Sequence, residues 1–578
     1  MSLPCTYDKH PVASISSSSQ DCAIGWPGVL ERLRGSQARI LCVECYPGSF
    51  VEEIERAIVG GLRPSCVFRA SECMKAREEV KVMLAPYLGD DPIFGRMNGV
   101  EIIDFFDPGK LAAAREAISK SRETILIIGT GASLLVPRAD LLVYADMARW
   151  EIQTRQRNNE IANLGALNHT ERASLKYKRS FFVDWRSADR LKKRLLSKVD
   201  FLLDTNDRRC PKLISGDLFR RSLQAVVRRP FRVVPFFDPG PWGGEWMRKH
   251  FELSKGPPNY AWCFDCVPEE NSLLLGFGSV HVEIPAIDLV FSHPRELLGE
   301  AVHGRFGTEF PIRFDMLDTM GGGNLSLQVH PLTEYIEDKF GMPYTQDESY
   351  YLLDADEGAV VYLGLKEDVK PAEMMRGLQQ ANKNATPFPA DQFVNRWPVT
   401  KHDHLSIPAG TIHCSGKDCM VLEISATPYI FTFKLWDWGR LGLDGEPRPI
   451  HIEHGRENIQ WYRRTEWVRR NLVNRKEVVA RGDEWCEERT GLHEREFIET
   501  RRHWFTGKVE HDTRGGVNVL NLVEGPEIVV ESPEGAFEPF PVHYAETFIL
   551  PAAVGRYTIR ATREDRCGTI KAYVRTNP

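Results

Sequence analysis

Apolar runs alternate with helical patterns along the first part of the chain, from Ala38 to about Leu203. The segments ARILCVECYPG and TILIIGTGASLL are apolar and end in turn residues, which predicts buried strands. Between them, FVEEIERAIVGGL and KLAAAREAISKSR carry apolar residues at helical spacing, while GVEIIDFFD and LLVYADM are predicted as further strands. Strands that alternate with helices predict a parallel sheet covered by helices, with a ligand crevice beyond the carboxyl ends of its strands.

From Phe231 onward the pattern changes to short strands and tight turns. The stretches DPGPWGG, SKGPPN, DTMGGGN and LDGEPR mark these turns, and PAEMMRGLQQANK is the main helical segment. Many short strands at regular spacing predict a sandwich or barrel, and a jelly roll can hold a metal in its mouth. A second β-rich stretch runs from about Arg456 to Pro578, where ILPAAVGRY repeats the turn pattern of IPAGTIH without its histidine. We predict a second barrel there that lacks metal ligands.

These changes of pattern divide the chain into five predicted segments. The serine-rich start, SISSSSQD included, is predicted as a flexible tail over residues 1–36. A three-layer α/β domain follows over residues 37–205, and residues 206–230 form a linker. Residues 231–455 form a β domain with the metal site, and residues 456–578 form the second β domain. The predicted fold class is therefore multidomain, with an α/β domain followed by two all-β barrels.

Composition narrows the class of protein. The net charge of −6 over 578 residues is nearly balanced, which argues against a general attraction to nucleic acid or membranes. No apolar run approaches the roughly 20 residues of a membrane helix, and no secretion signal is recognisable at the start. The 13 cysteines follow no disulfide framework, which indicates reduced thiols. We expect a cytoplasmic protein without nucleic-acid or membrane partners, and its self-association stays open.

Four side chains predict a metal site. Gln328 and His330 lie two residues apart in LSLQVHP, so both point to one face of a strand. Glu348 in DESYYLLDA and His413 in IPAGTIH follow on further strand-like segments. Nitrogen and oxygen donors without thiolate are typical of catalytic metals that keep an exchangeable position. This donor set suits zinc, manganese, iron or nickel.

The same segments resemble type I phosphomannose isomerase. The strings PWGG, FGTEFP, LSLQVHP, IPAGTIH, VLEIS, DWGR and PRPIHIE occur in the order of that family, over roughly Phe231 to His454. The family is a zinc-dependent cupin enzyme that interconverts mannose 6-phosphate and fructose 6-phosphate. The resemblance implies this activity, a sugar phosphate as substrate, and one zinc ion per chain. Its implied metal ligands are Gln328, His330, Glu348 and His413.

The resemblance also implies which residues move protons. Glu423 of VLEIS and Arg440 of DWGR match positions in the active cleft of the family. Lys434 stands where the family usually has an arginine that is credited with a catalytic role. Lysine lacks the rigid fork of arginine but exchanges a proton more readily. The catalytic residues expected here are therefore Glu423, Lys434 and Arg440.

The residues that would bind the phosphate depart from the family pattern. Gln346 and Asp347 precede Glu348 where the family commonly has a lysine, and Asp315 replaces another lysine. A missing ammonium weakens the binding of a dianion unless another cation reaches it. The candidate substitutes are Arg313, Lys339, Arg440 and Arg448.

The first domain raises a separate question about nucleotides. YPGSF, with Gly48 and Ser49, stands where a phosphate-binding loop would lie, but the Gly-Lys-Ser/Thr ending is missing. ADMARW and EIQTRQRNNE resemble the arginine-bearing lid of nucleoside-kinase-type folds. The region therefore resembles a P-loop kinase domain with a degraded phosphate loop. It either binds nucleotide near Gly48 and Ser49, or it is a structural or protein-contacting domain.

A basic run with aromatic residues, ERASLKYKRSFFVDWRSADRLKKRLLSK, covers Glu171 to Lys198. Such a run can bind phosphates or single-stranded nucleic acid, but it is more often a solvated helix face or a bridge between domains. Three functions thus remain under consideration for the chain. They are a metal-dependent isomerase, a metal-containing cupin that only senses a sugar, and a bifunctional protein whose first domain also transfers phosphate.

Overall fold

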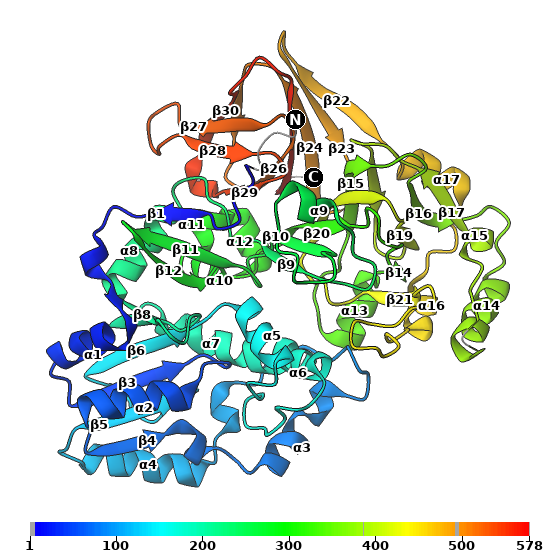
Figure 1. Cartoon of the computed structure of the whole chain (residues 1–578). Helices are drawn as coiled ribbons and strands as arrows, with labels where there is room; N and C mark the ends of the chain where they lie inside the picture. The colour runs from blue at the N-terminus through cyan, green and yellow to red at the C-terminus, as the bar shows by residue number, and fades with distance from the viewer. Residues whose placement is uncertain (1–5, 385, 492–495, 577–578) are drawn as a thin grey trace. The chain divides into compact units, whose positions relative to one another are not determined.

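The computed structural model describes residues 6–384, 386–491 and 496–576 (Figure 1). The chain divides into two compact units. The α/β unit contains Val12–Val226 and Pro268–His293, and the β unit contains Val227–Val267, Pro294–Pro578 and the start of the chain up to Pro11. A search of the described residues for a helix that could cross a membrane finds none.

A mostly parallel sheet forms the centre of the α/β unit. Its strand order is β2-β8-β7-β6-β3-β5-β4, in which β4, β5, β3, β6 and β7 run parallel to one another and β8 pairs antiparallel with both β7 and β2. The strands are β2 (Ala23–Ile24), β3 (Ile40–Cys45), β4 (Cys66–Arg69), β5 (Ile125–Gly129), β6 (Leu141–Asp146), β7 (Phe201–Asp204) and β8 (Lys212–Ser215). The predicted α/β alternation is confirmed.

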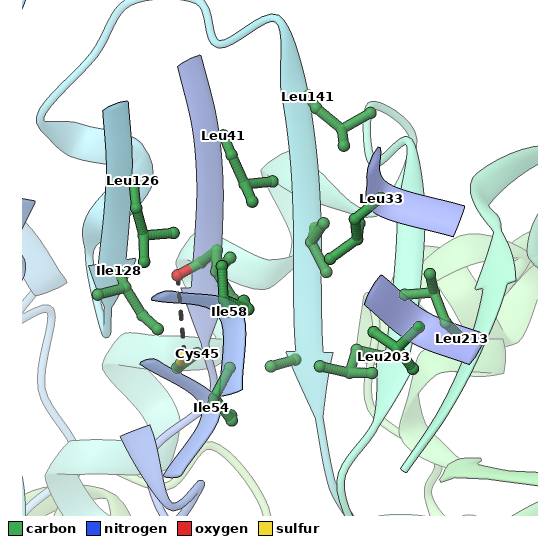
Figure 2. Close-up of a cluster of buried hydrophobic side chains, with 14 of the residues drawn as sticks. Leu33, Leu41, Cys45, Ile54, Ile58, Leu126, Ile128, Leu141, Leu203 and Leu213 are labelled. Carbon is green, nitrogen blue, oxygen red and sulfur yellow. Dashed lines mark hydrogen bonds between the residues drawn. The ribbon is translucent and has the colours of Figure 1, made fainter. Parts of the chain in front are cut away.

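Helices cover this sheet because each one buries an apolar face. Ile54 and Ile58 of α2 are almost fully buried, and Figure 2 shows them near Leu41, Leu126 and Ile128 of the strands. The helices of the first part of the unit are α1 (Gly25–Gly35), α2 (Val51–Leu62), α3 (Arg77–Leu88) and α4 (Pro108–Lys120). Those of the second part are α5 (Arg149–Arg157), α6 (Ala173–Arg179), α7 (Trp185–Leu195) and α8 (Gly216–Val226).

The predicted strand GVEIIDFFD is wrong, because the segment forms a short 3₁₀ helix over Ile102–Phe105. The Asp104 carboxylate accepts a hydrogen bond from the backbone N–H of Glu101 and caps this turn. Ile102 and Phe105 are fully buried while Ile103 is 39% exposed. Burial therefore recurs every third residue, as in a helix, and does not alternate as in a strand.

The structure draws different boundaries from the five predicted segments. The first five residues lie outside the described range, but Val12–Ser14 form β1, and β2 and α1 follow before residue 36. The predicted linker contains all of β8 and α8. An insertion of the later sequence also joins the α/β unit, because β1 pairs in parallel with β11 (Ser272–Phe277). That insertion continues with β12 (Val280–Pro285) and α10 (Ile287–Ser292).

Buried ion pairs fasten this insertion to the α/β unit. The Lys192 ammonium of α7 lies 2.8 Å from Asp146 at the end of β6 and 2.7 Å from Asp288 of α10. All three side chains are at most 1% exposed. The predicted basic run thus has a buried face, on which Phe181, Phe182 and Trp185 are inaccessible to stacking bases.

Two facing sheets form the first barrel of the β unit. One sheet has the order β18-β15-β20-β13-β10-β9 and the other β17-β16-β19-β14-β21. The first contains β9 (Phe236–Asp238), β10 (Trp262–Cys266), β13 (Ile312–Asp318), β15 (Glu348–Ala355), β18 (His404–Ile407) and β20 (Cys419–Ala426). The second contains β14 (Leu327–Val329), β16 (Val360–Leu365), β17 (Val394–Pro398), β19 (His413–Ser415) and β21 (Phe433–Trp436).

Helices accompany this barrel, and a second pair of sheets follows it. The helices are α9 (Trp246–His250), α11 (Pro294–Leu298), α12 (Glu300–Phe306), α13 (Thr333–Phe340), α14 (Pro371–Asn384), α15 (Ala390–Phe393), α16 (Ile452–Asn458) and α17 (Thr465–Asn471). The second pair of sheets has the orders β22-β23-β24-β31-β26-β29 and β25-β30-β27-β28.

The strands of this second pair enclose an apolar core that includes Leu520, Leu522, Phe548 and Ile559. Their bounds are β22 (Lys476–Arg481), β23 (Trp485–Thr490), β24 (Ile498–Phe505), β25 (Lys508–Asp512), β26 (Asn518–Glu524), β27 (Glu527–Glu531), β28 (Phe540–His543), β29 (Thr547–Leu550), β30 (Arg556–Ala561) and β31 (Cys567–Val574). Both β-rich stretches predicted from the sequence are present.

We predict that Lys192→Met destabilises the α/β unit by about 3–5 kcal/mol, because Asp146 and Asp288 would remain buried without their cation. Hydrogen exchange in β6 and α7, measured by mass spectrometry, would report the loss of protection. The matched control is Lys198→Met, which removes an exposed lysine just after the same helix. Equal protection in the two variants would contradict the role given to the buried triad.

Candidate metal centre

The strand register of the smaller sheet places three polar residues in one row. Gln328 of β14 is directly opposite His413 of β19 on one side and Lys434 of β21 on the other. Directly opposite residues of neighbouring strands project to the same face of a sheet. His330 lies two residues beyond Gln328 and shares its face.

The facing sheet brings a second polar set together. Glu348 of β15 is opposite Ser425 of β20, which is opposite Arg313 of β13. In the row two residues along, Glu423 of β20 stands opposite Tyr350 of β15. Strand alternation therefore puts Arg313, Glu348, Tyr350, Glu423 and Ser425 on one face.

The two sets meet around one carboxylate. His330 Nε2 lies 3.1 Å from Glu348 Oε2, and His413 Nε2 lies 2.8 Å from Glu348 Oε1. The three groups offer ligand atoms that all lie within 4.8 Å of one another, and each side chain is buried. The Gln328 carboxamide nitrogen is 3.2 Å from His413 Nε2. The structure thus brings all four predicted ligands together.

The three donors fit a divalent metal ion. His330 Nε2 and Glu348 Oε1 are buried atoms that make no hydrogen bond of normal geometry among the described residues. Buried polar atoms almost always have a partner, so two such atoms beside a third donor indicate a bound ion. His413 Nδ1 is 2.9 Å from the Thr411 carbonyl oxygen. That bond places the proton on Nδ1 and leaves Nε2 to coordinate a metal.

The charges of this centre shift the pKa values of its buried groups. Burial opposes the charge of Glu348, but the two imidazoles outweigh burial and hold its pKa below the usual range. Burial also opposes protonation of His330, yet the Glu348 carboxylate raises the pKa of His330. Burial, followed by the charge of Glu348, raises the pKa of Glu423 to about 7. Glu423 therefore exchanges its proton near neutral pH.

Gln346 links the metal-binding carboxylate to Glu423. Its amide nitrogen donates to Glu348 Oε2 at 3.0 Å and to Glu423 Oε1 at 3.2 Å. Arg313 donates to Glu423 Oε1 at 2.7 Å and also pairs with Asp315. Gln346 thus holds two carboxylates side by side.

The remaining predicted cations fall into two groups. Arg440 and Arg448 lie 2.7 Å and 2.9 Å from opposite oxygens of Asp437. Arg448 also donates to Ser326 Oγ, next to β14, at 3.0 Å. Lys339 lies on α13 with its side chain 53% exposed and pairs with Asp338 at 2.9 Å. Among the described residues, no contact joins Lys339 to the metal ligands.

The outer face of β15 packs against the second barrel. His404 Nε2 is 2.9 Å from the hydroxyl of Ser349, the neighbour of Glu348. His402 bridges the Tyr351 hydroxyl at 2.9 Å and the Glu524 carboxylate of β26 at 3.0 Å. These histidines therefore support the strand that carries Glu348, without touching the metal ligands themselves.

Sequence reasoning missed several polar residues of the site. Tyr350 is fully buried and its ring lies 5.8 Å from that of His413, while Ser425 donates to Glu423 at 2.9 Å. Tyr350 lies two positions after Glu348, and Ser425 lies two positions after Glu423. Both Glu348 and Glu423 were predicted from the sequence as site residues. The alternation of the strand could have identified them.

Comparison with known proteins gives three findings. A domain of unknown function (DUF8485) matches residues 25–228. The mannose-6-phosphate isomerase of Streptococcus mutans is 28% identical over 214 residues, which are 37% of this chain and 62% of that protein. Mannose-6-phosphate isomerase ManA of Bacillus subtilis is 24% identical over 241 residues, 41% of this chain and 69% of that protein. The chain is therefore homologous to these isomerases over about 40% of its length.

Among solved structures, the mannose 6-phosphate isomerase of Bacillus subtilis matches with a TM-score of 0.49 and 20% identity. The match covers 60% of this chain and 99% of that one. The aligned part spans less than two thirds of the Streptococcus mutans protein.

We predict that acid weakens the joint between β15 and the second barrel. Burial lowers the pKa of His402 to about 4 and that of His404 to about 3. The unfolded chain, with histidine pKa values near 6.5, then binds more protons than the folded chain. Stability that is present above about pH 6.5 is lost as the pH falls toward 4.

Melting temperatures between pH 4 and pH 8 would measure this loss. His402→Gln should make the dependence shallower, because it removes one of the two groups. His10→Gln, which replaces an exposed histidine, serves as the control. The assignment fails if His402→Gln and the unaltered chain show the same pH dependence.

Proposed function

We propose that the protein is a metal-dependent aldose-ketose isomerase that interconverts mannose 6-phosphate and fructose 6-phosphate. The observation that carries the proposal is the convergence of His330, Glu348 and His413 on one point. It occurs in a chain that is homologous to mannose-6-phosphate isomerases over 37% to 41% of its length.

His330, Glu348 and His413 would hold the ion, and Gln328 would complete the set. We propose zinc, one ion per chain, because two imidazoles, a carboxylate and an open position match its catalytic sites. When bound, the ion supplies Lewis-acid stabilisation of the negative charge that develops on the sugar oxygens.

Glu423 is the residue that we propose to move the proton. Isomerisation through an enediol needs one group that removes a proton from one carbon and returns it to the next. A pKa near the working pH is the best compromise for such a group, and that of Glu423 is about 7. Arg313 and Ser425 hold its carboxylate in place.

The two other expected catalytic residues lie beside this centre. Lys434 shares the row of Gln328 and His413, so its side chain projects to the face that carries the metal ligands. We propose that Lys434 assists the proton transfer and that Arg440 orients the sugar.

The phosphate is best placed near Arg440 and Arg448. Arg313 is neutralised by two carboxylates, Glu423 and Asp315. Arg440 and Arg448 share the single carboxylate of Asp437, which leaves one positive charge for a dianion. We therefore propose Arg448 as a phosphate ligand and Arg313 as the residue that positions Glu423. The predicted role of Lys339 stays a prediction.

We predict that the purified protein converts mannose 6-phosphate to fructose 6-phosphate, and that His413→Ala abolishes both turnover and tight metal binding. A coupled assay and metal analysis of the same sample measure the two properties. His281→Ala, which removes an exposed histidine of the α/β unit, is the matched control. Metal and sugar phosphate binding without turnover would favour the alternative of a non-catalytic sensor.

A second prediction separates Glu423 from the metal ligands. Glu423→Gln should lower kcat by about 10²- to 10⁴-fold, because an amide cannot accept the proton. Its metal content should stay at that of the unaltered chain. A variant that keeps its kcat would remove Glu423 from the reaction, whatever its effect on stability.

A further inference from the structure

A large cavity lies at the carboxyl edge of the parallel sheet in the α/β unit. Its volume is about 920 Å³, within the range of small-molecule sites. The segments that follow β3, β4 and β5 line it, together with residues 160–167 after α5. In open α/β sheets, ligands bind beyond the carboxyl ends of the strands.

Two places in the cavity could bind an anion, but one already binds a carboxylate of the chain and the other carries negative charge. The backbone N–H groups of Gly131 and Ser133, after β5, donate to the buried Glu44 carboxylate at 2.6 Å and 2.8 Å. The first turn of α2 carries Glu52 and Glu53, which oppose a second negative charge at that helix end. The phosphate of a ligand must therefore bind elsewhere in the cavity.

Three cations gather at the wall that follows β4. Lys75 and Arg77 flank the start of α3, and Lys110 of α4 donates to the Met74 carbonyl at 3.0 Å. The Lys75 ammonium is likewise fixed by the Asp104 carbonyl at 2.6 Å. Within the described part of the chain, none of the three forms an ion pair with a carboxylate. The first turn of α3 carries Glu78 and Glu79, but neither pairs with these cations among the described residues. Two fixed ammonium groups and a guanidinium together suit a phosphate group.

The rest of the lining suits a hydroxyl-rich body. Glu52 and Glu160 contribute carboxylates from α2 and from the segment after α5, and Ser49 contributes a hydroxyl. Ser49 is 8% exposed, and within the described residues its Oγ has only the Met147 sulfur, 4.0 Å away, as a partner. Carboxylates accept hydrogen bonds from sugar hydroxyls, and a buried hydroxyl needs a stronger partner than a thioether.

We infer that this cavity binds a phosphate ester of a hydroxyl-rich small molecule, with its phosphate at Lys75, Arg77 and Lys110. The ligand is either a nucleoside phosphate or a sugar phosphate, since both present a phosphate and several hydroxyls. The predicted residues Gly48 and Ser49 also line the cavity, where they would contact the body of the ligand. This inference does not depend on the proposed isomerase activity.

Isothermal titration calorimetry on the full chain tests the inference. The probes are ATP, ADP, inorganic phosphate and mannose 6-phosphate, the last in the His413→Ala background to weaken binding at the metal centre. We expect saturable binding of at least one phosphate ester. The double variant Lys75→Ala, Lys110→Ala should weaken it by about tenfold or more.

Lys81→Ala is the matched control, because it removes an exposed lysine of α3 that does not line the cavity. Thermal unfolding of each variant shows whether the α/β unit is still folded. Binding of ATP or ADP names a nucleoside phosphate, and binding of mannose 6-phosphate alone names a sugar phosphate. The inference is overturned if no phosphate ester binds, or if the double variant and Lys81→Ala bind equally well.

Discussion

The burial of one carboxylate between two imidazoles is the interaction on which the β unit depends. Glu348, His330 and His413 are removed from water, and each needs a partner that the surrounding apolar side chains do not supply. The strand register brings these groups together, because Gln328 stands opposite His413 and Glu348 opposite Ser425. A slip by one residue would turn every donor away from the shared point. The strand register that forms the barrel therefore also fixes the position of the metal ligands.

In the α/β unit, buried carboxylates pair with a lysine of the chain and not with histidines. Lys192 pairs directly with both Asp146 and Asp288, and burial together with the charge of Asp146 raises the pKa of Asp288. The insertion that carries Asp288 comes from the later sequence, so this contact joins two distant parts of the chain. Charges at the cavity after β4 are arranged in the opposite way, because Lys75 and Lys110 are fixed by carbonyl groups instead of carboxylates. The structural lysine, Lys192, thus has carboxylate partners, whereas the lysines proposed to bind a ligand have carbonyl partners.

Much of the fold was predictable, because each prediction rested on local periodicity. The buried strands β3, β5 and β6, the helix α2 and the change to short strands after Phe231 all follow from apolar spacing. The predicted strand GVEIIDFFD was wrong, because its buried apolar residues recur at helical spacing and Asp104 caps the turn. The insertion Pro268–His293 and the pairing of β1 with β11 could not be predicted. The strand pairing joins residues more than 250 positions apart, and the contact of Lys192 with Asp288 joins residues 96 positions apart.

The site, like the fold, has parts that the sequence could predict and parts that it could not. Gln328, His330, Glu348 and His413 could be chosen from donor chemistry and order, and the structure brings them together. The network of Gln346, Arg313 and Glu423 was not predictable, because a glutamine carries no charge signal and its role comes from its two neighbours. The roles of Lys434, Arg440 and Arg448 stay predictions, as does the likeness of the first domain to P-loop kinases.

X-ray absorption spectroscopy of the metal in the purified protein tests the central claim most directly. The account predicts one tightly bound divalent ion per chain with only nitrogen and oxygen neighbours, at about 2.0–2.2 Å if the ion is zinc. The imidazole signal should fall in His330→Ala and in His413→Ala. Sulfur neighbours, or a spectrum unchanged in both variants, would contradict it.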